Sequence, residues 1–403
     1  MDRCKAEGCG GCAYQGIPYE EQLAAKENEV RNLLKNYESV FEGIQPTPSQ
    51  YNYRNKMEYT FGNLAKGEPM CLGMHKKGSY LSLVDASCCQ IVPEDFNTLV
   101  KLTIDFCNGN AYTFYHKKAH EGLMRNLILR QGVRTGELLV NIVTNDGDFD
   151  EQAFVELVKH APLKSAVTGI LHTINRNRAD AFKCDELRLL DGHPYYMEEI
   201  MGLKFKVGPF SFFQTNVEAA ERLYTQALEL IPNVEGKTCF DLYCGTGTIT
   251  QALALKAKEA IGVEIVAEAV DAARENAALN GLDNCRFICG DVGEVIDSIE
   301  EKPDVIVVDP PRIGMTPKAM NRILAYGIPE ILYISCNPKS LAENLRQAAM
   351  SGYKPVKIRA YDNFAFTSHV ETVCLLIHQN AKAKHHVNVG IDAEDYYKIK
   401  EGK

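Results

Sequence analysis

Hydrophobic and polar positions divide the chain into stretches with different periodicities. Over residues 19–37, apolar residues recur near helical spacing and predict an amphipathic helix. From residue 46 to about 190, short runs that alternate between apolar and polar residues, such as 56–61 and 138–143, are separated by glycine-containing turns. This alternation predicts a mainly antiparallel sheet with some helix.

After residue 196 the pattern changes to apolar runs that alternate with helical stretches. Such alternation predicts βαβ units, and therefore an α/β fold in which a doubly wound, Rossmann-like parallel sheet carries helices on both faces. Two closing strands are expected at 353–361 and 370–377. The predicted strands are 238–242, 260–264, 285–289, 305–309 and 331–335, and the predicted helices are 249–258, 266–280, 317–326 and 338–350.

These changes of pattern predict a division of the chain into four parts. A cysteine-bearing segment and helix occupy residues 1–45, and a β-rich central domain follows over 46–195. The doubly wound domain covers 196–380, and a polar tail covers 381–403.

Composition and charge limit the cellular compartments and the binding partners that are expected for this chain. The N-terminus has no apolar signal segment and no run approaches 18 apolar residues, so we expect no membrane association. Fourteen cysteines in such a chain favour a reducing, cytoplasmic environment. The net charge of −9 means that binding to nucleic acid would need a local basic patch. Candidates are Arg54 and Lys56, Lys76 and Lys77, and the cations between residues 117 and 134.

A glycine loop follows the first strand of the doubly wound domain. Gly245 and Gly247 allow a tight turn and a close approach to a ligand, and Glu264 at the end of the next strand can accept hydrogen bonds from ribose hydroxyls. This arrangement suits NAD or S-adenosylmethionine, or only an ordinary turn. Thr250 stands where the dinucleotide fingerprint has its third glycine, which argues against NAD. Asp291, at the end of the third strand, would meet the adenine amino group or cap the strand.

Three further strings occur in a fixed order near strand ends: Asp309-Pro-Pro-Arg312, Ser335-Cys336-Asn-Pro338 and His369-Val-Glu371. With them the chain resembles the RNA 5-methyluridine methyltransferase family. The resemblance covers nearly the whole chain before the tail, because the segments around Gln214, Tyr53 and Met124 are also similar to that family. It implies a class I methyltransferase domain that uses S-adenosylmethionine and a central domain that binds RNA.

The resemblance also implies a role for each site residue. Cys336 would add to carbon 6 of uracil so that carbon 5 can attack the methyl group, and Glu371 would then remove the proton from carbon 5. Asp309 would orient the uracil edge, and Phe212 would lie against the target base. The residues expected at the cofactor are Gln214, Asp241, Tyr243, Gly245, Gly247, Glu264, Asp291 and Asp309.

Each of these residues also has a simpler interpretation. A cysteine after an apolar strand is often a small core residue, and Glu371 could be a strand residue paired with a lysine. Cytosine-5 enzymes are a close alternative, but they place their nucleophilic cysteine in the earlier box, and Asp309-Pro-Pro-Arg312 contains none. A non-catalytic RNA-binding iron–sulfur protein is an alternative of another class.

The N-terminal cysteines have the spacing of metal ligands. Cys4, Cys9 and Cys12 form a C-x4-C-x2-C pattern, which equals the plant-type ferredoxin spacing and also suits zinc. The resemblance favours a [4Fe–4S] cluster with Cys89 as the fourth ligand and Cys88 as the alternative.

Together these observations predict methylation of uracil C5 in structured RNA by a monomer. The cysteine pattern resembles the branch that modifies ribosomal RNA, so 23S ribosomal RNA is the expected substrate and transfer RNA the alternative. Family members frequently carry an RNA-binding β-barrel ahead of the cysteines. We expect this chain to lack that barrel, which leaves the choice of RNA open.

Overall fold

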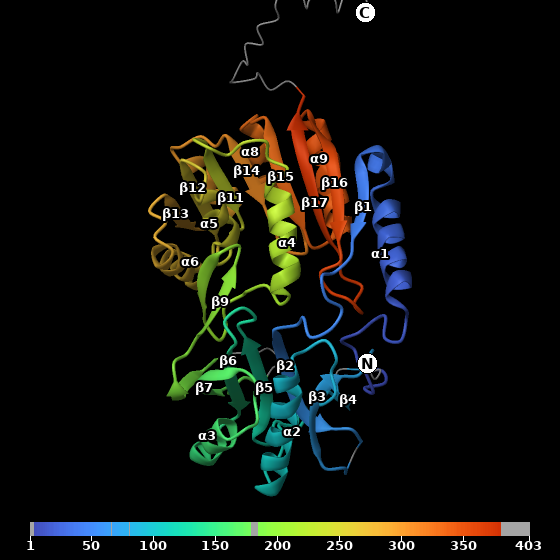
Figure 1. Ribbon diagram of the computed structural model, residues 1–403, viewed down its shortest axis with the longest axis vertical. Coiled ribbons are helices and arrows are strands. Elements are labelled where there is room, and N and C mark those ends of the chain that lie inside the picture. The colour runs from blue at the N-terminus through green and yellow to red at the C-terminus, as the bar shows by residue number, and fades with distance from the viewer. Residues whose placement is uncertain (1–3, 66, 80, 179–183, 380–403) are drawn as a thin grey trace, which may run out of the picture.

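The computed structural model describes residues 4–65, 67–79, 81–178 and 184–379, and the predicted polar tail lies outside them. Two large sheets occupy opposite ends of the long axis of the molecule (Figure 1). The sheet at one end is built mainly from the C-terminal half of the chain, and the sheet at the other end from the central part.

The C-terminal sheet has eight strands in the order β1-β16-β17-β15-β14-β11-β12-β13. All neighbours are parallel except β17, which runs antiparallel to both β15 and β16. The order reverses at β11 and β14, so ligands are expected at the crevice beyond the carboxyl ends of these two strands. This arrangement confirms the predicted Rossmann-like fold. The strands are β1 (Phe41–Gln45), β11 (Thr238–Leu242), β12 (Glu259–Glu264), β13 (Cys285–Cys289), β14 (Val305–Val308), β15 (Glu330–Ser335), β16 (Tyr353–Tyr361) and β17 (Glu371–His378).

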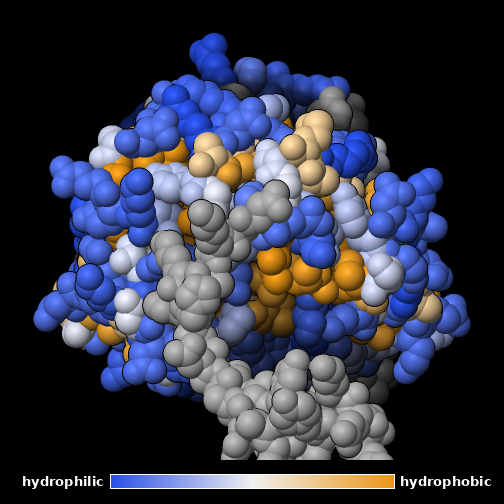
Figure 2. Space-filling view, turned by 90° about the horizontal axis from the view of Figure 1, so that it is seen from above, coloured by the Kyte–Doolittle hydropathy of each residue, from blue (hydrophilic) through white to orange (hydrophobic). Residues whose placement is uncertain are grey.

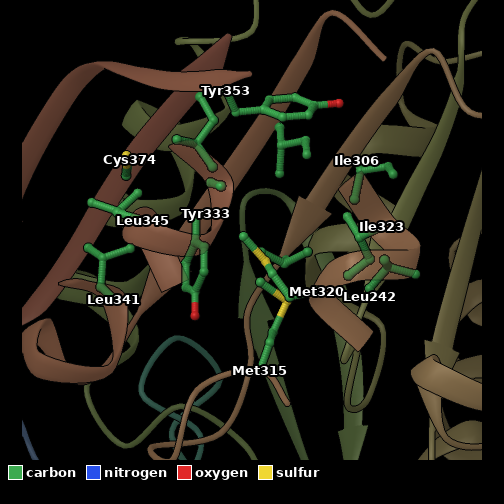
Figure 3. Packing of buried hydrophobic residues seen from close by; sticks show 14 of the residues in the cluster. Leu242, Ile306, Met315, Met320, Ile323, Tyr333, Leu341, Leu345, Tyr353 and Cys374 are labelled. Carbon is green, nitrogen blue, oxygen red and sulfur yellow. The ribbon is translucent and has the colours of Figure 1, made fainter. Parts of the chain in front are cut away.

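Helices cover both faces of this sheet because its strands are apolar on both sides. In β14, Ile306 and Val308 pack into one core and Val305 and Val307 into the other. The first core lies beneath α1, α8 and α9, and Figure 3 shows part of it. The helices are α1 (Tyr19–Leu33), α4 (Val217–Leu228), α5 (Thr248–Ala254), α6 (Ala267–Leu279), α7 (Val292–Val295), α8 (Pro317–Ala325) and α9 (Pro338–Met350).

The N-terminal part of the chain contributes to this distant sheet. Strand β1 pairs in parallel with β16 at the sheet edge, and Val30 and Leu34 from the end of α1 enter the same core. Short 3₁₀ turns at Lys35–Val40 and Ile296–Ser298 complete this half.

The central sheet has seven strands in the order β4-β3-β2-β5-β6-β7-β8. Its pairings are antiparallel except that of β6 with β7, which α3 connects as a crossover. A hairpin of β9 and β10 leads from it to the other half (Figure 1). The elements are β2 (Lys56–Asn63), β3 (Met70–His75), β4 (Leu83–Asp85), α2 (Glu94–Gly109), β5 (Met124–Gln131), β6 (Glu137–Thr144), α3 (Glu151–Lys159), β7 (Ala166–Ile174), β8 (Glu186–Gly192), β9 (Tyr196–Ile200) and β10 (Leu203–Val207).

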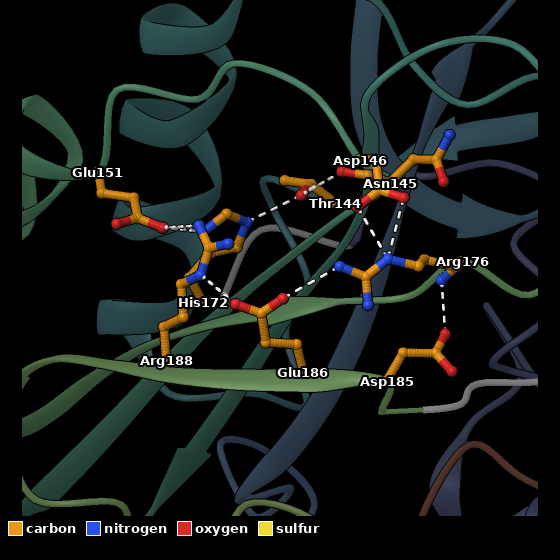
Figure 4. A network of polar contacts seen from close by, with 9 residues as sticks. All are labelled: Thr144, Asn145, Asp146, Glu151, His172, Arg176, Asp185, Glu186 and Arg188. Atoms are coloured by element: carbon orange, nitrogen blue, oxygen red, sulfur yellow. Dashed lines mark hydrogen bonds and ion pairs between the residues drawn. The ribbon is translucent and has the colours of Figure 1, made fainter.

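A polar network holds one end of the central sheet together (Figure 4). The buried His172 imidazole lies 2.6 Å from Glu151 and 2.8 Å from the Thr144 hydroxyl, and Arg188 joins Glu151 to Glu186.

The face at the other end of the molecule is mostly hydrophilic with an apolar area near its centre (Figure 2). Among the described residues, no helix combines the length and apolar character that a membrane crossing requires.

Candidate active site

Three reactive side chains meet at the carboxyl edge of the parallel strands. Asp309 directly follows β14 and Cys336 directly follows β15, which is the parallel neighbour of β14. Glu371 begins β17 and lies at the same edge because β17 runs in the opposite direction. The pairing of Ser335 with Thr372 therefore places Cys336 beside Glu371. The structure brings together the three residues that the sequence analysis proposed for the chemistry.

The acidic groups of this cluster interact electrostatically. Burial raises the pKa of Glu371 to about 7, and Arg312 opposes this rise. Burial raises the pKa of the Cys336 thiol to about 11, reinforced by Glu371 and Asp309 and opposed by Arg312. Burial, Glu371 and Asp241 raise the pKa of Asp309 well above its usual range. The resting thiol is therefore protonated at neutral pH, whereas Glu371 titrates where a general base works efficiently.

The residues after Cys336 fix its place ahead of a helix. Asn337 precedes α9 and accepts a hydrogen bond from the Lys339 N–H at 3.1 Å, and Pro338 occupies the first turn, where its missing N–H costs nothing. The Asn337 side chain also donates to the Arg312 carbonyl at 2.8 Å, which ties the two strand-end boxes together. The positive end of the α9 dipole acts against the burial that raises the pKa of the Cys336 thiol.

The loop that leads into Glu371 is held by several distant parts of the chain. Lys26 on α1 lies 2.7 Å from the Asp362 carboxylate, and both side chains are fully buried. Other contacts hold the loop backbone, so the position of Glu371 depends on the N-terminal segment as well as on its own strand. These contacts are Lys26 to the Phe364 carbonyl, Tyr53 to the Ala365 carbonyl, Asn216 to the Asn363 carbonyl, Gln22 to the Phe366 N–H and the Tyr14 N–H to the Phe366 carbonyl.

The glycine loop adopts the backbone that its sequence predicts. Gly247 has φ of 82°, and an added Cβ would lie 2.8 Å from the Phe287 ring, so no side chain fits there. Gly245 also has positive φ and donates its N–H to the Glu264 carboxylate at 3.0 Å. Tyr243 has φ of 72°, an uncommon conformation for a residue other than glycine. The loop therefore leaves open space beside Gly245 next to a carboxylate.

Asp241 and Thr250 explain the missing third glycine. The Thr250 hydroxyl donates to Asp241 at 2.6 Å in a buried position. Burial raises the pKa of Asp241 to about 7, and its second carboxyl oxygen has no hydrogen-bond partner among the described residues. A buried acceptor of this kind fits a ligand that brings its own donor, as the amino group of S-adenosylmethionine would.

The remaining predicted residues surround this crevice at different depths. Gln214 donates to the Tyr224 hydroxyl at 2.6 Å. Burial raises the pKa of Tyr224, and Asp309, Glu371 and Asp241 add to this rise. Tyr224 was missed by the sequence analysis, since a tyrosine on an amphipathic helix resembles any core residue. Asp291, which was predicted to contact the cofactor, precedes α7. Burial raises the pKa of Tyr243 to about 12, and Asp291 adds to this rise. The Phe212 side chain is 71% exposed on the loop before α4.

The N-terminal cysteines gather near one another without forming a recognisable metal centre. Burial raises the pKa of Cys12 to about 12, with contributions from Cys89, Cys9 and Cys4. Burial likewise raises the pKa of Cys4, and Cys88 and Cys9 add to this rise. In the part of the chain that the structure describes, no group of three or more His, Cys, Asp or Glu side chains is arranged to hold a metal ion. The described thiols therefore lie in one region, but they are not arranged as ligands of a single metal ion.

The reversed strand order, the glycine loop after the first strand and the carboxylates at the following strand ends fit a class I, S-adenosylmethionine-dependent methyltransferase. Comparisons with known proteins narrow this class. The model of the tRNA (uracil-5-)-methyltransferase family matches residues 199–379. An uncharacterized RNA methyltransferase of Clostridium tetani is 47% identical over 376 residues, which cover 92% of this chain and 82% of the relative. Another from Caldanaerobacter subterraneus is also 47% identical over 376 residues, covering 91% and 82%.

A solved structure agrees over nearly the whole chain. The Pyrococcus abyssi tRNA (uracil-54, C5)-methyltransferase in complex with S-adenosyl-L-homocysteine superposes with a TM-score of 0.76 and 27% identity, covering 92% of this chain and 86% of that one. The chain belongs to the RNA 5-methyluridine methyltransferase family, as the sequence analysis expected. It is an RNA (uracil-5-)-methyltransferase that uses S-adenosylmethionine.

Proposed function

We propose that the chain methylates its uridine through a covalent bond between Cys336 and the base. The Cys336 thiol gives up its proton to solvent, its sulfur bonds to carbon 6, and the electron pair of the C5–C6 double bond moves into an enolate. When bound, S-adenosylmethionine would supply a methyl group on a positively charged sulfur. Carbon 5 would take that methyl group, and S-adenosylhomocysteine would leave. Glu371 then accepts the carbon 5 proton, the C6–S bond breaks and the double bond returns. The observation that carries this proposal is the meeting of Cys336, Glu371 and Asp309 beside the glycine loop.

Asp309 is proposed to select uracil. The raised pKa of Asp309 favours its neutral, protonated form. The carbonyl oxygen of this acid can accept a hydrogen bond from uracil N3–H, and its hydroxyl can donate one to uracil O4. The exposed ring of Phe212 offers a surface on which an unstacked base can rest. Gln214, Asp241 and Glu264 are proposed to hold the cofactor, with Tyr243 and Asp291 beside its adenosine.

We propose 23S ribosomal RNA as the substrate, because the cysteine pattern of the N-terminal segment resembles the ribosomal branch of the family. Transfer RNA is the second candidate, since the similar Pyrococcus abyssi enzyme is named for a transfer-RNA position. Mapping 5-methyluridine in ribosomal and transfer RNA of a deletion strain distinguishes them. We expect one site to disappear from 23S RNA while transfer RNA stays modified. The reverse result would assign the enzyme to transfer RNA, and unchanged 5-methyluridine in both would refute uracil methylation.

We further propose that Cys4, Cys9, Cys12 and Cys89 bind a [4Fe–4S] cluster. The supporting observation is that Cys12 interacts electrostatically with Cys4, Cys9 and Cys89, so four thiols share one small region. Four thiols fit the ligand chemistry of such a cluster, and its ligands stand farther apart than those of a single ion because the cluster lies between them. Its role would be structural: Tyr14, just after Cys12, binds the loop that leads to Glu371.

The cytoplasm is the proposed location, and a monomer the proposed active form. All fourteen cysteines of the sequence lie within the described residues and none forms a disulfide, which suits a reducing compartment.

A further inference from the structure

A cavity of about 350 Å³ lies on the central sheet, away from the cluster of Cys336, Asp309 and Glu371. It opens on the face of β2 that points away from the core: Tyr59 is buried in the core, and the alternate residues Glu58 and Thr60 line the cavity. The lining residues are Glu58, Thr60, Phe61, His75, Tyr115, Lys117, Arg125, Asn126, Asn175 and Arg178.

An irregularity in β5 turns two successive side chains into this cavity. The pairing of β5 with β6 shifts register between Met124 and Asn126, which makes Arg125 the extra residue. Such bulges re-aim side chains, and here both Arg125 and Asn126 line the cavity although neighbours on a regular strand point to opposite faces. The Arg125 guanidinium lies over the Tyr115 ring at 3.6 Å from its centroid and donates to the Asn177 carbonyl at 2.7 Å.

The loop after β7 supplies the opposite wall and is firmly held. The Arg176 side chain bonds to Asp146 at 2.9 Å and to Glu186 at 3.0 Å, and its backbone N–H donates to Asp185 (Figure 4). These bonds position Asn175 and Arg178, on either side of Arg176, at the cavity.

The lining has the chemistry of a site for a nucleotide. Lys117, Arg125 and Arg178 bring three cations against the single carboxylate of Glu58, in a chain whose net charge is −9. Such a concentration of cations suits a phosphate. The side-chain amides of Asn126 and Asn175 also line the cavity, and an amide can donate to and accept from a base edge.

Strand β5 connects this cavity rigidly to the active site. Asn126 lies at the cavity, and Arg130, four residues along the same face, donates to the carbonyls of Gly208 and Ser211 in the loop that carries Phe212. Four strand residues span about 14 Å. A short single strand can cross that distance, so one RNA can reach both the cavity and the loop that carries Phe212.

We propose that this cavity binds a second nucleotide of the substrate RNA, outside the methylated uridine, by its phosphate and its base. The proposal rests on the proposed function in RNA methylation. It implies that the central domain recognises an unpaired nucleotide at a fixed distance from the target.

The test compares Lys117→Gln with Lys118→Gln. Lys118 is the next residue, is exposed and does not line the cavity, so it is a matched control. Binding of a 23S RNA transcript and of purified transfer RNA is measured by filter retention over a range of salt. We expect Lys117→Gln to bind the substrate RNA about tenfold more weakly and to flatten the slope of log affinity against log salt by about 0.7, the value of one phosphate contact on a single strand. Lys118→Gln should match the wild type.

Two further measurements decide the source of the ligand and the integrity of the fold. Asn126→Ala should raise KM for RNA and leave kcat and S-adenosylmethionine binding unchanged. Equal affinity and slope in the two lysine variants would overturn the proposal. Tight binding of uridine 5′-monophosphate that depends on Lys117, with unchanged RNA affinity, would overturn it in favour of a free nucleotide. Because RNA binding is measured without turnover, a wild-type enzyme that binds RNA but forms no 5-methyluridine would contradict the proposed function alone.

Discussion

Replacing Lys26 tests how the catalytic loop is held. The Lys26 ammonium and the Asp362 carboxylate are 2.7 Å apart with no exposed side-chain surface, and burial lowers the pKa of Lys26 while Asp362 opposes that change. Removing one partner of a buried ion pair leaves the other charge buried and unpaired, which lowers the stability of the fold by about 3–5 kcal/mol. Lys26→Met should therefore lower the free energy of unfolding by about that amount. Urea denaturation followed by circular dichroism measures it through linear extrapolation.

The same helix offers a matched control. Arg31 pairs with Glu27 at 2.7 Å and also with Glu38, but its side chain is 37% exposed and theirs are 30% and 53% exposed. An exposed pair contributes about 0–1 kcal/mol, so Arg31→Met should change stability little. The double variant Lys26→Met with Asp362→Leu should recover part of the loss, because it leaves no unpaired buried charge. A loss for Lys26→Met no larger than that for Arg31→Met would refute the reasoning.

Three other predictions concern the chemistry and the cysteines. Glu371→Gln should accumulate enzyme–RNA adduct on a denaturing gel, since methyl transfer occurs but the proton stays; an absence of adduct would count against Glu371 as the base. Because the base must be deprotonated and the pKa of Glu371 is about 7, release of methylated RNA should rise about tenfold from pH 6 to pH 8; a flat profile would contradict this. Anaerobically purified protein should contain about four irons per chain. Cys89→Ser should lose the iron and Cys88→Ser keep it; the opposite result would exchange the fourth ligand.

The doubly wound sheet could be predicted because each of its strands and helices has a recognisable pattern in the local sequence. Each strand is a short apolar run followed by a helical pattern, and each strand end carries a polar or reactive residue such as Asp309 or Cys336. The closing strands were also visible from their apolar content. What local patterns could not give is the insertion of β17 between β15 and β16, which is what brings Glu371 to Cys336.

Non-local contacts account for the features that the sequence did not reveal. Strand β1 pairs with β16 across more than three hundred residues, and five residues with the sequence FEGIQ contain no sign of that partner. Tyr224 joins the site only because α4 packs there. Lys117 and Lys118 are alike in sequence, and only the folded chain separates the one that lines a cavity from the one that faces solvent.

The most direct test of the central claim uses RNA in which the target uridine is 5-fluorouridine. Fluorine replaces the proton that Glu371 would remove, so the bond between Cys336 and carbon 6 cannot be released after methyl transfer. With S-adenosylmethionine, the wild-type enzyme should form a covalent complex that survives denaturation. Mass spectrometry of the digested complex should place the methylated base on the peptide that contains Cys336, and Cys336→Ala should form none. A wild-type enzyme that forms no complex, or an adduct on another cysteine, would contradict the account.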